Sequence, residues 1–257
     1  MAENHFKCAV FDLDGVVTQS ASIHSEAWKT MFDEYLKVWS AEKGVEFKEF
    51  TNEDYLKYVD GKPRYQGCKS FFESRGVDLP FGDPSDGPDV ISICGLGNKK
   101  NALYKSILGE KGAEVFPTSV EFIKELKRRG IRVGVASSSA NTKMVLQKAG
   151  LSDLFETRVC GIVSAEMSLK GKPNPDIFVV AAKALGFDPV DTIMVEDAIA
   201  GVQAGAAGKF GLVLGVAREI AADELKQNGA DVVVSDLSEI SVDQVDEWFA
   251  SGKNKKN

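Results

Sequence analysis

The amino-acid sequence predicts an α/β protein that has a mostly parallel sheet and a helical insertion after the first strand. Short apolar segments alternate with helical patterns from about residue 116 onward, which is typical of a parallel sheet covered by helices. One further apolar segment stands alone near the N-terminus. The long stretch between it and the alternating part is more polar and contains no clear strand pattern, so we expect it to form a separate helical unit.

The first expected strand is Phe6–Phe11, a short apolar run that ends abruptly at Asp12. Helix ends are expected at Gly130 and Gly150, because glycine favours the C-terminal cap of a helix. The other expected strands are 131–136, 158–163, 192–195, 211–215 and 231–234. The helices expected among and after them are 117–129, 141–149, 176–185, 198–207, 217–228 and 242–250.

The insertion begins with an amphipathic pattern, in which Ile23, Ala27, Met31 and Tyr35 are spaced four residues apart on one helix face. This pattern predicts a helix over about 22–39. Further helical patterns occur at 52–59, 65–75 and 98–108. We therefore expect a core domain made of residues 1–18 and 111–257, and a helical cap domain made of residues 19–110.

Composition limits the class of partner. The 257 residues include 31 basic and 38 acidic side chains, and the net charge of −7 argues against a binder of nucleic acid or of anionic membranes. No apolar run approaches the roughly 18 residues of a membrane span, and no secretory signal is expected. The four cysteines are scattered and form no metal or disulfide pattern, which is typical of a reducing compartment. A cytoplasmic location is expected.

Polar side chains follow several of the expected strands. In an open parallel sheet, ligands bind beyond the carboxyl ends of the strands, so these residues should share one edge of the sheet. Lys172 lies in a Pro-rich segment before an expected helix and is expected at the same edge. The candidate set consists of Asp12, Asp14, Ser137, Lys172, Glu196 and Asp197.

This combination of side chains fits phosphoryl transfer. Carboxylates from separate strand ends can hold Mg²⁺, and an ionised aspartate beside the metal can attack phosphorus to form an aspartyl phosphate. A lysine and a serine hydroxyl can bind the phosphoryl oxygens in the transition state. Asp14, two residues after Asp12, is placed to protonate the leaving oxygen, a role usually worth about 10²–10⁴ in rate.

These segments carry a family resemblance. Asp12-Leu-Asp14-Gly-Val, Ser137 after a strand, Lys172-Pro-x-Pro-Asp and Glu196-Asp197 resemble, in order, the four motifs of the haloacid dehalogenase superfamily. The resemblance implies a Rossmann-like core whose helical cap selects the substrate and excludes water. Further positions resemble the β-phosphoglucomutase-like branch of that superfamily: Val17-Thr18, His24, Trp28 and Ala198-x-x-Gly201-x-x-Ala204.

The resemblance also implies a role for each core residue. Asp12 would be the nucleophile and a Mg²⁺ ligand, and Asp14 would be the general acid and base and bind the metal through its backbone carbonyl. Ser137 and Lys172 would hold the phosphoryl group. The remaining metal positions would be Asp197, as a ligand, and Glu196, which would assist directly or through water.

The remaining positions would contact the substrate. Arg64, Ser139 and Asn141 match groups that hold a second, non-transferring phosphate in mutases, and Lys100-Asn101 matches a pair near the sugar. His24 is equally compatible with a structural role, and Trp28 is typical of cap packing. The expected substrate-binding set is His24, Trp28, Arg64, Lys100, Asn101, Ser139 and Asn141.

Two departures from the mutase pattern bear on the reaction. Ala140 and Asp60 stand where mutases commonly carry lysines, so fewer positive charges are present for a second phosphate. We therefore expect, as the main activity, Mg²⁺-dependent hydrolysis of a small sugar phosphate. The alternative is a β-phosphoglucomutase, which interconverts β-glucose 1-phosphate and glucose 6-phosphate. The expected partner is a small phosphorylated metabolite, bound by a monomer, with neither nucleic acid nor membrane involved.

Other functions fit the sequence less well. A phosphate-binding module without catalysis is a distant alternative, because every catalytic position carries a competent side chain. A dehalogenase needs one nucleophilic aspartate and no metal, which would leave Asp14 and Asp197 without a task. An ordinary acidic turn or a calcium loop at Asp12 is disfavoured, because Val16, Val17 and Ser20 do not match calcium ligands.

Overall fold

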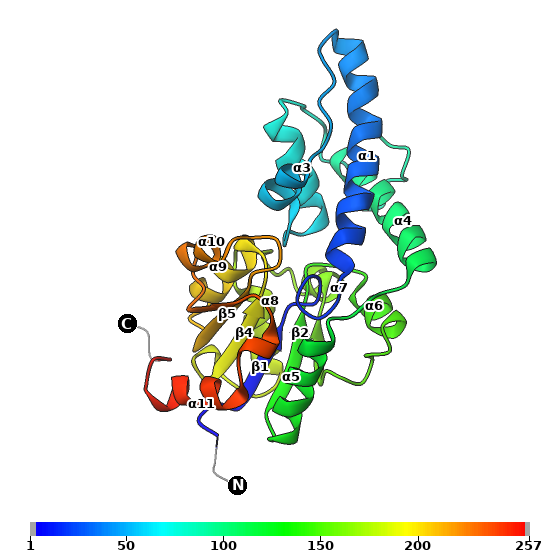
Figure 1. The fold of residues 1–257 in the computed structure, drawn as a ribbon. Coiled ribbons are helices and arrows are strands. Elements are labelled where there is room, and N and C mark those ends of the chain that lie inside the picture. The colour runs from blue at the N-terminus through cyan, green and yellow to red at the C-terminus, as the bar shows by residue number, and fades with distance from the viewer. Residues whose placement is uncertain (1–3, 255–257) are drawn as a thin grey trace. The chain divides into compact units, whose positions relative to one another are not determined.

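The computed structural model describes residues 4–254 and contains one six-stranded sheet (Figure 1). All strand pairs are parallel, and the spatial order is β3-β2-β1-β4-β5-β6. This confirms the α/β fold class that the sequence predicts. The strands are β1 (Cys8–Phe11), β2 (Arg132–Ala136), β3 (Thr157–Val159), β4 (Thr192–Glu196), β5 (Leu212–Val216) and β6 (Val232–Val234).

The register of the central strands aligns the residues that follow them. Phe11 at the end of β1 is paired with Val135 of β2 on one side and with Val195 of β4 on the other. All four residues of β1 are fully buried, as expected for a central strand covered on both faces. Asp12 therefore emerges between the carboxyl ends of two neighbouring strands.

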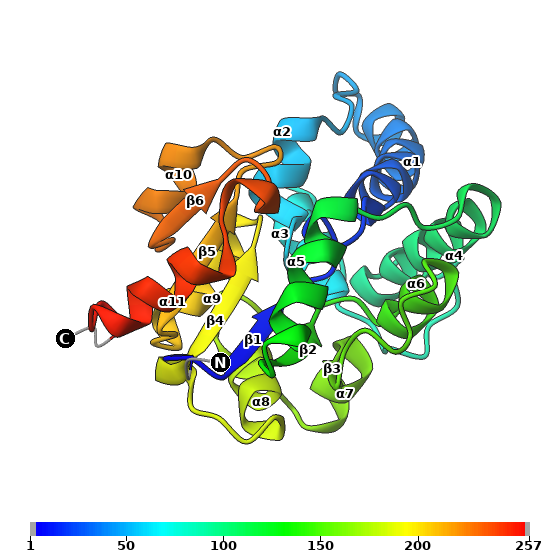
Figure 2. The same cartoon turned by 60° about the horizontal axis from the view of Figure 1, so that its bottom comes forward.

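Helices cover both faces of this sheet. Figure 2 shows α5 and α11 on one face and α8, α9 and α10 on the other. The chain first adds β2 and β3 on one side of β1 and then β4, β5 and β6 on the other side, so right-handed crossovers place the connecting helices on opposite faces. Among residues 4–254, no helix combines the length and the apolar character that crossing a membrane would need. The helices of this unit are α5 (Pro117–Arg128), α6 (Thr142–Lys148), α7 (Gly161–Glu166), α8 (Asp176–Ala184), α9 (Ile199–Ala207), α10 (Ala222–Gln227) and α11 (Val242–Ala250), with short 3₁₀ turns η2 (Pro189–Asp191) and η3 (Leu237–Glu239).

Two predicted elements differ from the structure. The strand predicted over 158–163 ends at Val159, and α7 begins at Gly161. A short apolar run suits either an edge strand or a helix, so periodicity alone could not separate the two. The helix predicted over 217–228 is confined to α10, because Ala217 still bonds to β6 and Arg218 lies in the following turn.

The chain divides into two compact units, with boundaries between Gln19 and Ser20 and between Gly112 and Ala113. The sequence placed these boundaries one and two residues earlier. The first unit holds the sheet, and the second is helical. The helical unit contains α1 (Ser20–Lys43), α2 (Asn52–Asp54), a π-helical turn η1 (Tyr55–Val59), α3 (Arg64–Ser74) and α4 (Ile93–Lys111).

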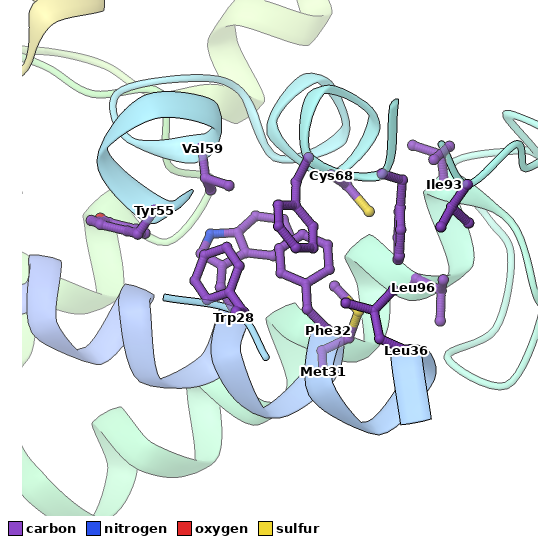
Figure 3. Close-up of a cluster of buried hydrophobic side chains, with 13 residues drawn as sticks. Trp28, Met31, Phe32, Leu36, Tyr55, Val59, Cys68, Ile93 and Leu96 are labelled. Carbon is purple, nitrogen blue, oxygen red and sulfur yellow. The ribbon is translucent and has the colours of Figure 1, made fainter. Parts of the chain in front are cut away.

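Aromatic side chains form the core of the helical unit (Figure 3). Phe32 on α1 is fully buried at the centre of this core. Its ring centroid lies 5.0 Å from those of Trp28 and Phe50, 4.2 Å from that of Phe71 and 5.0 Å from that of Phe72. Large aromatic side chains bury more apolar area per residue than aliphatic ones, so this cluster contributes much of the apolar burial of the unit.

We expect Phe32→Ala to reduce the free energy of unfolding of the helical unit by about 3–5 kcal/mol, because the truncation leaves a cavity among four aromatic rings. Urea denaturation followed by tryptophan fluorescence measures the loss. Phe81→Ala is the matched control, since Phe81 is 51% exposed and its truncation should cost less than about 1 kcal/mol. Equal losses in the two variants would contradict this description of the core.

Candidate active site

Asp12 and Asp14 lie in a tight turn directly after β1. The amide of Asp12 still donates to the carbonyl of Val195, which fixes the start of the turn to β4. Gly15 has a φ of +88°, and its amide donates to the carbonyl of Thr18. This backbone conformation is rare for any residue with a Cβ, so the glycine allows the chain to reverse immediately after the two aspartates.

Lys172 is held between two carboxylates. Its Nζ donates to Oδ1 of Asp12 at 2.6 Å and to Oε1 of Glu196, and its side chain is almost fully buried. The ammonium also lies 4.9 Å from the centroid of the Phe178 ring on α8. This ion triad, defined as Lys172 with Asp12 and Glu196, joins the ends of β1 and β4 to the loop that precedes α8.

Burial and charge act in opposite directions on these groups. Burial alone would lower the pKa of Lys172, but Asp12 and Glu196 outweigh it and hold that pKa above its usual value. Burial raises the pKa of the Asp12 carboxyl, with Lys172 opposing this effect and Glu196 and Asp14 adding to it. Lys172 therefore remains an ammonium, and Asp12 depends on nearby positive charge to stay ionised.

Glu196 uses both of its oxygens within the protein. Oε1 accepts from Lys172, and Oε2 accepts from the backbone amides of Asp197 and Ala198 at 2.7 and 2.6 Å. The side chain is fully buried. In this arrangement Glu196 orients Lys172 and the turn that carries Asp197.

The loop after β2 brings Ser137 to the same edge. The Ser137 hydroxyl donates to Oδ2 of Asp14 at 3.1 Å and accepts from the amide of Ser139. The hydroxyl of Ser139 in turn accepts from the amide of Asn141, which is largely buried. The six predicted core residues thus lie together, with Ser139 and Asn141 continuing the loop that carries Ser137.

The residues present fit a divalent cation. A Cβ added to Gly15 would lie 1.9 Å from Oδ2 of Asp197, so the Asp197 carboxylate lies against the backbone of the turn that carries Asp14. Asp12 and Glu196 contact the single ammonium of Lys172, and Asp14 and Asp197 add two further carboxylates in the adjoining turns. This excess of negative charge favours a hard cation with oxygen ligands. Within residues 4–254, no three His, Cys, Asp or Glu side chains form a metal cluster by themselves. The expected ligands Asp12, Glu196 and Asp197 do not form such a cluster, and both oxygens of Glu196 bond to Lys172 and to backbone amides instead.

The predicted residues of the helical unit form a second group. Lys100 on α4 is buried, and its Nζ lies 2.5 Å from Nδ1 of His24 and 4.7 Å from the centroid of the Trp28 ring. Asn101 follows on the same helix. Arg64 lies beside Gly97 of the same helix, and its Nη2 donates to the Tyr65 hydroxyl at 3.0 Å.

Sequence reasoning missed one residue at the sheet edge. Arg218 follows β5, its Nε donates to the Gly15 carbonyl at 3.4 Å, and its Nη1 donates to Asp236 at 3.0 Å. Its guanidinium carbon lies 3.8 Å from the centroid of the Phe116 ring. Arg218 also follows the carboxyl end of a strand, so the same search of strand ends could have selected it. It was missed because a helix was predicted to begin at residue 217.

The chain is similar to several known proteins. A family model described as haloacid dehalogenase-like hydrolase matches residues 6–209. A protein named beta-phosphoglucomutase from Mycobacterium tuberculosis is 43% identical over 238 residues, covering 91% of each chain. Another protein of that name, from Bacillus subtilis, is 29% identical and covers 94% of this chain and 95% of its own. A crystal structure of beta-phosphoglucomutase from Clostridium difficile has a TM-score of 0.77 at 24% identity, covering 96% of this chain and 98% of that one, which supports the fold.

We expect Lys172→Met to lower the free energy of unfolding by about 3–5 kcal/mol at pH 7, because two buried carboxylates lose their counter-charge. The deficit should shrink as the pH falls toward 5. In the variant the buried Asp12 carboxyl has no adjacent ammonium to oppose the effect of burial, so its folded-state pKa lies above its unfolded value. The native state therefore gains protons and relative stability as pH decreases. Chemical denaturation at several pH values measures both effects.

Lys183→Met is the control for that experiment. Lys183 also forms an ion pair, with Asp188, but both side chains are more than half exposed. Its loss should cost less than about 1 kcal/mol. Similar costs for the two lysines at pH 7 would contradict the role assigned to the ion triad.

Proposed function

Because the chain belongs to the haloacid dehalogenase-like hydrolase family and is an enzyme of phosphoryl transfer, we propose that it is a β-phosphoglucomutase. The main structural support for phosphoryl transfer is the buried contact between Lys172 and Asp12, which is 2.6 Å long. In the proposed reaction Asp12 would be the nucleophile, and the ammonium of Lys172 beside it would also face the phosphoryl oxygens.

In the proposed first step, an Oδ atom of Asp12 attacks the phosphorus of the substrate. A bond from this oxygen to phosphorus forms while the bond from phosphorus to the sugar oxygen breaks. Asp14 gives a proton to the leaving sugar oxygen, and the Ser137 hydroxyl, which already contacts Asp14, binds a phosphoryl oxygen. The products of this step are an aspartyl phosphate on Asp12 and a free sugar hydroxyl.

In the second step, Asp14 removes a proton from the next acceptor. If that acceptor is another hydroxyl of the sugar, the reaction is an isomerisation, and if it is water, the reaction is a hydrolysis. Both outcomes use the same core residues. The choice therefore depends on which acceptor the helical cap admits and on how strongly a second phosphate is held.

The relatives favour isomerisation over hydrolysis. The protein that is 43% identical over nearly the full length is named for the mutase, and so is the relative at 29% identity. The absence of lysine at Ala140 and Asp60 had favoured the phosphatase. That argument considered the charge at these two positions only. Arg64, Ser139 and Asn141, which match the groups that hold the second phosphate in mutases, are all present in the sequence.

Mg²⁺ is the proposed cofactor. Asp12, the backbone carbonyl of Asp14 and Asp197 would hold it, and Glu196 would act through water, since its own oxygens bond to Lys172 and to backbone amides. When bound, the cation would neutralise charge on the phosphoryl group and favour the ionised form of Asp12.

The helical unit is the proposed cap, with a substrate-binding role for its own predicted group. Lys100, His24 and Trp28 already form one cluster, in which a neutral imidazole would accept a hydrogen bond from the ammonium. Arg64 would bind the non-transferring phosphate, and Asn101 would contact the sugar. The partner remains a small phosphorylated sugar.

Product analysis tests the proposed reaction. Given β-glucose 1-phosphate, Mg²⁺ and a catalytic amount of the corresponding bisphosphate, the protein should form glucose 6-phosphate with little inorganic phosphate. Both products are quantified in the same reaction. Stoichiometric release of inorganic phosphate would instead establish the phosphatase, and Asp12→Asn should abolish either activity because its amide cannot act as the nucleophile.

Gly15→Ala should raise the Mg²⁺ concentration needed for half-maximal activity by about tenfold, equivalent to ~1.4 kcal/mol. The added Cβ would displace the Asp197 carboxylate, which lies 1.9 Å from its position. Gly130→Ala is the control, because Gly130 also has a positive φ of +78° but nothing lies within 4 Å of its Cβ position. An unchanged Mg²⁺ requirement in Gly15→Ala would contradict the metal assignment of Asp197.

A further inference from the structure

Gly201 lies in the first turn of α9, directly beside the buried carboxylate of Glu196. A Cβ added to Gly201 would lie 1.9 Å from both Cδ and Oε1 of Glu196 and 2.5 Å from its Cγ. Atoms in real structures do not approach this closely. The space that an ordinary side chain at residue 201 would fill is therefore occupied by the Glu196 side chain.

The backbone gives no other reason for glycine at this position. Gly201 is helical and has no positive φ, so an L-amino acid with a side chain could adopt its conformation. Glycine is also among the least favourable residues for a helix interior, where alanine is preferred. Close approach of another group is the remaining structural explanation, and the group that approaches is Glu196.

Glu196 cannot easily move away from residue 201. It is fully buried, its Oε2 accepts from the amides of Asp197 and Ala198, and its Oε1 accepts from Lys172. A shift of the carboxylate would break at least one of these bonds. The bond to Lys172 is the one that involves a second side chain, and Lys172 in turn contacts Asp12.

We propose that Gly201 is a positioning residue for the active site: its missing Cβ leaves room for the Glu196 carboxylate, which holds Lys172 against Asp12. The inference rests on the proposed function for its kinetic consequence only. The steric part concerns the fold of the protein and can be tested without any substrate.

Gly205 provides a matched control on the same helix. A Cβ there would also be crowded, lying 2.9 Å from Cγ2 of Val213 and 3.1 Å from Sδ of Met194. These neighbours belong to β5 and β4 and form part of the apolar core. Gly205→Ala therefore adds the same methyl group to the same helix, under milder crowding and without contact with the ion triad.

The first test is a double-mutant cycle on stability, measured as the midpoint of urea denaturation. Gly201→Ala should lower the midpoint in the wild-type background. In the Glu196→Ala background the same substitution should raise it, because the space is then vacant and alanine favours the helix. An equal decrease in both backgrounds would overturn the proposal.

The second test measures kcat and KM for β-glucose 1-phosphate. Gly201→Ala should lower kcat on the order of tenfold to a hundredfold, as displacement of a catalytic group by about 1 Å does. Gly205→Ala should keep the wild-type kcat. In the Glu196→Ala background, where Cγ and the carboxylate are both absent, Gly201→Ala should cost little of the activity that remains. The same fold-loss in both backgrounds, or a wild-type kcat for Gly201→Ala, would overturn the proposal.

The two tests separate this inference from the proposed function. A wild-type protein that transfers no phosphoryl group would refute the proposed function, and the stability cycle would still decide the role of Gly201. Conversely, the wild-type enzyme could be active while Gly201→Ala changes stability equally in the wild-type and Glu196→Ala backgrounds. That result would support the proposed function but refute the positioning role of Gly201.

Discussion

The ion triad of Lys172 with Asp12 and Glu196 is the interaction on which the site depends. One buried ammonium connects the end of β1, the end of β4 and the loop before α8. Burying an ammonium is costly unless carboxylates compensate it, and burying two carboxylates is costly without the ammonium. The three side chains therefore hold one another in place, and Asp14, Ser137 and Asp197 lie around this centre.

The sheet explains why these residues meet although they are far apart in the chain. Parallel strands end at the same edge, and the register places Phe11 beside both Val135 and Val195. The residues after these positions then face one another without long loops.

The sheet and the core site were predictable from the sequence, because each depends on short-range patterns at strand ends. Asp12 and Glu196 follow from this rule, and Lys172 follows from its Pro-rich segment and from the family resemblance. Elements near the sheet edges were less predictable, since the apolar run from Arg158 to Val163 suits both a strand and a helix. The role of Gly201 was not predictable, because it depends on an empty volume that only coordinates reveal. The choice between mutase and phosphatase depends on the groups that contact a second phosphate. The lack of lysine at Ala140 and Asp60 favoured the phosphatase, whereas the relatives favour the mutase.

The most direct test of the central claim is to trap the covalent intermediate. The wild-type enzyme is mixed with β-glucose 1-phosphate and Mg²⁺, quenched in acid within milliseconds and digested for mass spectrometry. The account predicts one phosphoryl group on the peptide that contains Asp12, absent from Asp12→Asn and reduced in Lys172→Met. A phosphoryl group on Ser137, or turnover of the sugar phosphate without any phosphorylated peptide, would contradict it.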